Sequence, residues 1–163
     1  MDTTEMKEFV EGIALLWKEN KRRELLYIHV MKRDHLGNLR RLCNQGHISA
    51  LLFQKEIQWI YDYFKCNLND CDLKDGFEAS PADYAHEATL DTLTDTSMVV
   101  RLIKEAELTT IRGYQSVIRF VDRDGEVHSI LRDHLDRITH LCSEFGREAS
   151  PYFKRASFSP LYS

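Results

Sequence analysis

Four long stretches of the chain place residues suited to a buried helix face at alternating steps of three and four, and this spacing constrains the fold most. Such spacing is typical of helices packed in a bundle. The predicted helices cover residues 4–32, 35–64, 97–121 and 126–145, within one domain of residues 1–146. Residues 147–163 are predicted to form a C-terminal tail.

Residues 65–96 keep no sustained period and include Gly76 and Pro81, which predicts a long connection with a helical turn near Tyr84. The links before the second and fourth helices are short, so each joins an antiparallel helix pair. The middle link, of about 30 residues, is long enough to return along a helix of about 45 Å. We therefore expect an all-α four-helix bundle with a long crossover; simple up-down-up-down order is the alternative.

Several residues predict where these helices begin and end. Asp34 is a suitable N-cap for the second helix, and Ser97 or its neighbours Asp95 and Thr96 can cap the third. Gly146 is suited to end the fourth helix.

The composition fits one helical domain and argues against several classes of function. In a chain of 163 residues, a hydrophobic share of 43% is enough for one continuous core. The formal charge of -4 argues against nucleic-acid binding. No apolar run approaches the roughly 18 residues of a membrane span. The Met-Asp-Thr-Thr-Glu start resembles no secretory signal, which predicts a cytoplasmic protein.

Two groups of reactive or charged residues are predicted to have no specific chemistry. The cysteines lack zinc-ribbon spacing and are expected to be free thiols, with a disulfide between Cys66 and Cys71 as the alternative. Basic residues near the first interhelical turn are expected to form a solvated surface: Lys21, Arg22, Arg23, Lys32, Arg33, Arg40 and Arg41.

Three ionisable residues fall on the predicted buried faces at similar heights: Glu24, Glu107 and His134. Two carboxylates that meet in a core repel each other, so one takes a proton or a cation lies between them. Iron, manganese or zinc would suit glutamate and imidazole ligands, and His47 lies close enough in register to join them. The residues predicted to surround this site are Asn20, Tyr27, Thr110 and Tyr114.

The same residues also permit a site without a metal. In this alternative, Glu24, Glu107, His134, Tyr27 and Tyr114 form a hydrogen-bonded network with an arginine, which fixes the helix register and performs no chemistry.

The pattern resembles the ferritin-like superfamily, and within it a small bacterial family of unknown function. The residues that carry the resemblance are Asn20-Lys-Arg-Arg-Glu24 with Tyr27, Glu107 followed by Tyr114, and Leu135-Asp136-Arg137-Ile138. It implies a di-iron site with a single Glu on each of two helices and Glu-x-x-His on each of the others. Glu24 and Glu107 match the single carboxylates. The paired motifs are replaced by Gly46 with Ser49 and by Arg132 with Leu135.

Two functions remain open from the sequence. The first is a non-catalytic assembly or partner-binding bundle, a homo-oligomer and most simply a dimer, that needs no cofactor. It is suggested by apolar residues of the second helix that lie outside its buried face: Leu51, Leu52, Trp59 and Tyr63. The second is a metal-dependent oxidoreductase or metal-storage protein that uses Glu24, Glu107, His134 and His47.

Overall fold

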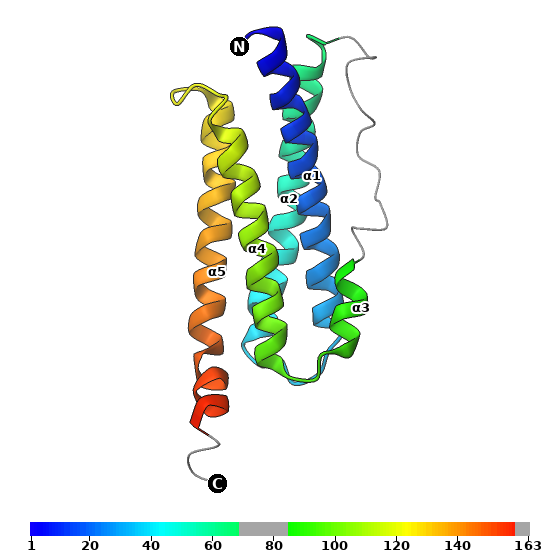
Figure 1. Ribbon diagram of the computed structural model, residues 1–163, viewed down its shortest axis with the longest axis vertical. Helices are drawn as coiled ribbons and strands as arrows, with labels where there is room; N and C mark the ends of the chain where they lie inside the picture. Colours follow the sequence, from blue (N-terminus) through cyan, green and yellow to red (C-terminus); the bar gives the residue numbers. More distant parts are fainter. Residues whose placement is uncertain (69–84, 159–163) are drawn as a thin grey trace.

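The structure, a computed structural model, describes residues 1–68 and 85–158, with the side chains of residues 85–88 and 150–158 left out. Five helices lie within these ranges: α1 Thr3–Met31, α2 Leu39–Lys65, α3 Ala85–Thr92, α4 Thr96–Ile118 and α5 Glu126–Phe158. Four of them are long and pack as an all-α bundle (Figure 1).

The helix order confirms the predicted crossover. Helix α1 packs against α2 and α4, and α5 packs against α4 and α2. Each of these neighbouring pairs is antiparallel, whereas α2 and α4 run in the same direction (Figure 1). The chain must therefore return along the bundle between α2 and α4, which excludes simple up-down-up-down order. The short helix α3 lies in this connection and packs against α1; Tyr84, near which a turn was predicted, lies outside the described residues.

Side-chain caps explain where two of the long helices begin. The Asp2 carboxylate accepts a hydrogen bond from the Glu5 backbone N–H, and Glu5 accepts one from the Asp2 N–H, which forms a capping box at α1. Asp95 caps α4 by accepting from the Ser97 N–H at 3.0 Å, as predicted for one of the candidate caps.

Helix α2 begins at Leu39, later than the predicted residue 35, and Asp34 is not its N-cap. The reason lies in the intervening loop, where His35 and Gly37 have φ values of 62° and 57°. A helix cannot continue through this left-handed conformation. The helix therefore starts only after Asn38, which occupies the N-cap position.

Helix α5 continues to Phe158, so the predicted end at Gly146 is wrong. Gly146 has none of the positive φ that makes glycine suitable for ending a helix. The buried stripe also continues through it, because both Phe145 and Ala149 are fully buried. Packing on either side of the glycine thus favours an unbroken helix.

The buried apolar residues form two clusters along the bundle. One surrounds Tyr27 and Phe145 near the α1–α2 turn, and the other surrounds Phe9 and Phe53 toward the opposite end. Polar residues of α1 and α4 fall between the clusters along their helices: Asn20, Arg23, Glu107 and Thr110. None of the helices in the described residues combines the length and apolar character needed to cross a bilayer.

Candidate functional site

Arg23 is the centre of the buried polar layer, with its side chain only 1% exposed. Its Nε donates to Glu107 Oε1 at 2.7 Å, its Nη1 to Asn20 Oδ1 at 2.9 Å, and its Nη2 to Ser49 Oγ at 3.0 Å. Burial alone would lower the Arg23 pKa, but the charge and hydrogen bond of Glu107, together with the nearby Tyr27 and Tyr114, outweigh burial, and the pKa is raised. A charged guanidinium therefore joins α1, α2 and α4.

A second set of hydrogen bonds extends from Asn20 to the surface. Asn20 Nδ2 donates to Tyr114 Oη at 2.8 Å, and Tyr114 Oη lies 2.9 Å from His134 Nδ1. His134 Nε2 lies 3.2 Å from Glu56 Oε1, whose side chain is 45% exposed. The layer thus connects the buried guanidinium to a carboxylate at the edge of α2.

The protonation states determine the donor and the acceptor in each of these hydrogen bonds. Burial, then the charges of Arg23 and Arg137, lower the pKa of His134 to about 3, so the imidazole is neutral near pH 7. Glu56 favours the imidazolium, but water reaches this carboxylate and screens it. Burial also raises the pKa of Tyr114, which keeps its phenol protonated. We assign Tyr114 as the donor to Nδ1 and Nε2–H as the donor to Glu56, since this satisfies every group.

Aromatic stacking also holds one face of the His134 ring. It stacks on Phe53 with ring centroids 3.8 Å apart and an interplanar angle of 12°. The guanidinium carbons of Arg23 and Arg137 lie 5.6 Å and 5.7 Å from the centroid of the same Phe53 ring. This packing leaves the imidazole little freedom to turn toward another ligand.

Tyr27 and Glu107 meet at the other edge of the layer. Within the described residues, neither the Tyr27 hydroxyl nor Glu107 Oε2 has a hydrogen bond of good geometry. The two groups are nevertheless neighbours. Burial raises the pKa of Tyr27 most, and the nearby Glu107 charge raises it further. Gly46 makes room for the phenol ring: a Cβ at this position would lie 2.4 Å from Tyr27 Cε2.

The structure brings together only some of the residues predicted to form the site. Asn20, Glu107, Tyr114 and His134 belong to one hydrogen-bonded layer, and Tyr27 borders it. They are linked through Arg23.

The other predicted residues lie apart from these bonds. Glu24 pairs with Lys21 at 2.7 Å, and Thr110 Oγ1 bonds Ala106 O and Glu19. His47 is partly buried. In the described part of the chain, no hydrogen bond joins Glu24 or His47 to Glu107 or His134.

The di-iron site implied by the family resemblance does not fit these residues. Arg23 already supplies the cation beside Glu107, and both ring nitrogens of His134 have hydrogen-bond partners. Among the described residues, no group of three or more His, Cys, Asp or Glu side chains is placed to hold a metal ion. The geometry instead corresponds to the predicted network with an arginine, except that Glu24 lies apart from it and Tyr27 only borders it.

Arg23 and Glu56 were missed as members of the layer. Arg23 was predicted to lie on a solvated basic surface because charged residues flank it. A clearer signal was its spacing, since it follows Asn20 by three positions and precedes Tyr27 by four, and both were expected to be buried. Glu56 lies outside the buried stripe of α2, so only the approach of α5 reveals its role.

Fold and site together define an all-α four-helix bundle with a crossover and an arginine-centred polar layer. Comparisons with protein-family models, curated proteins and solved structures found no match to this chain.

Proposed function

We propose that this protein is a non-catalytic assembly module on a ferritin-like scaffold, which associates with itself through the outer face of α2. The crossover order of the four long helices supports the ferritin-like scaffold. The buried polar layer supports a structural role, because its charges and most of its polar groups are bonded to one another. Such a layer fixes helix register.

The observation that carries the proposal is the exposed apolar face of α2. Ile48, Leu52, Trp59 and Tyr63 are 48%, 45%, 48% and 62% exposed. Their spacing places all four on one side of the helix. The opposite side of α2 is already buried in the bundle. A helix that is apolar on both sides is typical of one that packs against a further partner.

The test is a measurement of solution mass by sedimentation equilibrium for the parent and two variants. Trp59→Glu places a charge within the α2 face, whereas Leu15→Glu makes the same change at a 61% exposed leucine of α1. We expect a parent mass that is a multiple of 19.1 kDa, a monomer for Trp59→Glu and no change for Leu15→Glu. A monomeric parent, or a Trp59→Glu variant that still assembles, contradicts the proposal.

The metal-binding alternative has its own measurement. Protein purified without chelators and then incubated with iron, manganese or zinc is analysed for bound metal. Stoichiometric binding that falls in both Glu24→Ala and Glu107→Ala would favour a metal-binding function over the assembly role. The pairing of Glu107 with Arg23 leads us to expect no such binding.

A further inference from the structure

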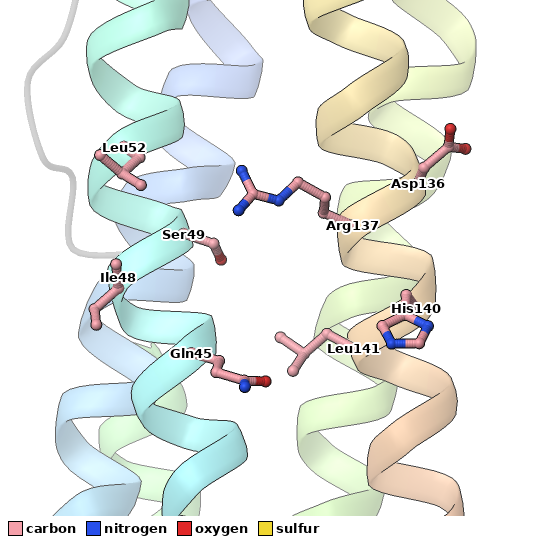
Figure 2. A pocket seen from close by; sticks show the side chains of 8 residues that line it. All are labelled: Gln45, Ile48, Ser49, Leu52, Asp136, Arg137, His140 and Leu141. Atoms are coloured by element: carbon pink, nitrogen blue, oxygen red, sulfur yellow. The ribbon is translucent and has the colours of Figure 1, made fainter.

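A recess of about 440 Å³ lies between α2 and α5 (Figure 2). Its apolar walls come from both helices, with Ile48 and Leu52 on α2 and Leu141 on α5. Binding sites for small molecules commonly have a volume of about 300–1,000 Å³ and combine apolar walls with a few polar groups. The recess therefore has the size of a small-molecule site, and its polar groups determine which kind of molecule suits it.

Arg137 supplies a permanent positive charge to the recess, because its side chain extends from α5 toward α2 (Figure 2). The guanidinium carbon lies 5.7 Å from the centroid of the Phe53 ring, a cation–π contact that favours this direction. Its ion pair, from Nη1 to Asp133 Oδ2, is 3.7 Å long, and both side chains are more than half exposed. Within the described residues Arg137 makes no hydrogen bond, so its planar set of N–H donors is available to a ligand.

Two polar side chains of α2 line the recess, but only one of them is available to bind a ligand. Gln45 points toward α5, and its amide has no hydrogen bond within the described part of the chain (Figure 2). The Ser49 hydroxyl, in contrast, donates to Gly46 O at 2.9 Å and accepts from Arg23 Nη2 at 3.0 Å. A ligand would therefore be bound by Arg137 and Gln45, whereas Ser49 fixes the wall to the buried polar layer.

The other ionisable groups that line the recess are paired along α5. Asp136 extends away from α2 and bonds Arg132 at 3.2 Å (Figure 2). His140 bonds Glu144 at 2.9 Å. Among the described lining residues, Arg137 is thus the cation without a carboxylate at hydrogen-bond distance.

We infer that the recess binds a small organic carboxylate with an aliphatic tail, whose head pairs with Arg137 and Gln45 and whose tail lies between Leu52 and Leu141. A planar, singly charged carboxylate matches one guanidinium through two parallel hydrogen bonds. The aliphatic walls on both helices suit the tail. All these residues belong to one chain, so the site goes beyond the proposed self-association and does not depend on it.

The charge of the ligand is tested with sodium octanoate as the probe, by isothermal titration calorimetry on the full chain. We expect one octanoate to bind per chain. Octylamine has the same tail with a positive head, and it should bind at least about tenfold more weakly because Arg137 repels it. Equal affinity for the two probes would show that only the tail is recognised and would overturn the inference, as would a lack of octanoate binding.

The role of Arg137 is tested with a matched pair of variants. Arg137→Gln removes the charge and should weaken octanoate binding about tenfold. Arg132→Gln removes an arginine of the same helix with a similar exposure, 59% against 54%, and should leave the affinity unchanged. Circular dichroism checks that both variants are folded. Equal effects of the two substitutions would contradict the assigned recognition.

The position of the probe is tested by backbone amide shifts in heteronuclear NMR. Octanoate should shift the amides of residues 45–52 and 136–141 most. Largest shifts around Trp59 and Tyr63 would instead indicate adsorption to exposed aromatic side chains and would reject the recess as the site.

Trp59→Glu separates this inference from the proposed function. Its octanoate affinity should equal that of the parent, because the recess lies within one chain, and a loss of binding would contradict such a site. A monomeric parent that binds octanoate through Arg137 rejects self-association and keeps the site. An assembled parent in which Arg137→Gln has no effect on binding does the reverse.

Discussion

Arg23 is the residue on which the interior of the bundle most depends. A buried arginine is stable only when its charge and its donors are matched, and here Glu107, Asn20 and Ser49 provide the partners. Removing one member of a buried ion pair costs more than removing both, because the remaining charge has no compensation.

Arg23→Met is expected to lower the free energy of unfolding by about 3–5 kcal/mol, since Glu107 is left buried and unpaired. The double variant Arg23→Met with Glu107→Met should recover a large part of this loss. Urea denaturation measures both. The control Arg132→Met, at a salt bridge to Asp136 with both side chains more than half exposed, should change stability by less than about 1 kcal/mol. Additive losses in the double variant would contradict the pairing.

His134 predicts a loss of stability in acid. The pKa of His134 is about 3 in the folded protein and 6.5 in the unfolded chain, so only the unfolded chain binds the proton between these pH values. The free energy of unfolding therefore falls as the pH drops from 6.5 toward 3, by about 5 kcal/mol over the window. Denaturation at several pH values should show a steeper loss for the parent than for His134→Gln. Equal slopes would show that the imidazole is not held neutral.

At the scale of the helices, glycine has opposite roles in α2 and α5. Gly46 is required for close packing, because its missing side chain admits the Tyr27 ring. Gly146 has no such role: a Cβ there would meet only the end of the Lys104 side chain, at 3.3 Å. Both lie inside helices, where alanine is intrinsically the better residue.

Gly46→Ala is expected to destabilise the protein by about 1–3 kcal/mol through overpacking against Tyr27. Gly146→Ala should instead be neutral or stabilise by up to about 1 kcal/mol, because it improves an uninterrupted helix. Chemical denaturation compares the two variants. A destabilising Gly146→Ala would indicate that α5 ends at this glycine after all.

At the scale of the whole molecule, the crossover and the exposed α2 face have different consequences. The crossover lets α2 and α4 run in the same direction and places α5 beside α2 (Figure 1). The α2–α5 edge therefore carries both a recess lined by Leu52 and Leu141 and the projecting aromatic residues Trp59 and Tyr63. Stability of an associating protein depends on its concentration, whereas that of a monomer does not.

The thermal midpoint of the parent should accordingly rise by several degrees between low and high micromolar concentration. Trp59→Glu, which removes the contact, should give a midpoint independent of concentration. Scanning calorimetry at three or more concentrations measures both, with Leu15→Glu behaving as the parent. A parent midpoint that stays constant would contradict association through this face.

The sequence alone predicted the bundle, because a buried stripe repeated at helical spacing needs no tertiary information to be recognised. Link lengths then predicted the crossover, and the stripe predicted the burial of Glu107 and His134. The ends of the helices were harder to predict, because the left-handed conformation of His35 and the continued packing beyond Gly146 depend on neighbouring segments.

Only the tertiary structure decided what the buried carboxylate binds. Helical spacing gives the face on which a residue lies, but it does not say which side chain from another helix reaches it. Arg23, taken from the sequence as a surface charge, turns inward because Glu107, Asn20 and Ser49 together satisfy its guanidinium. The sequence therefore determined the helices and their buried faces, whereas partner choice inside the core depended on contacts between residues distant in the chain.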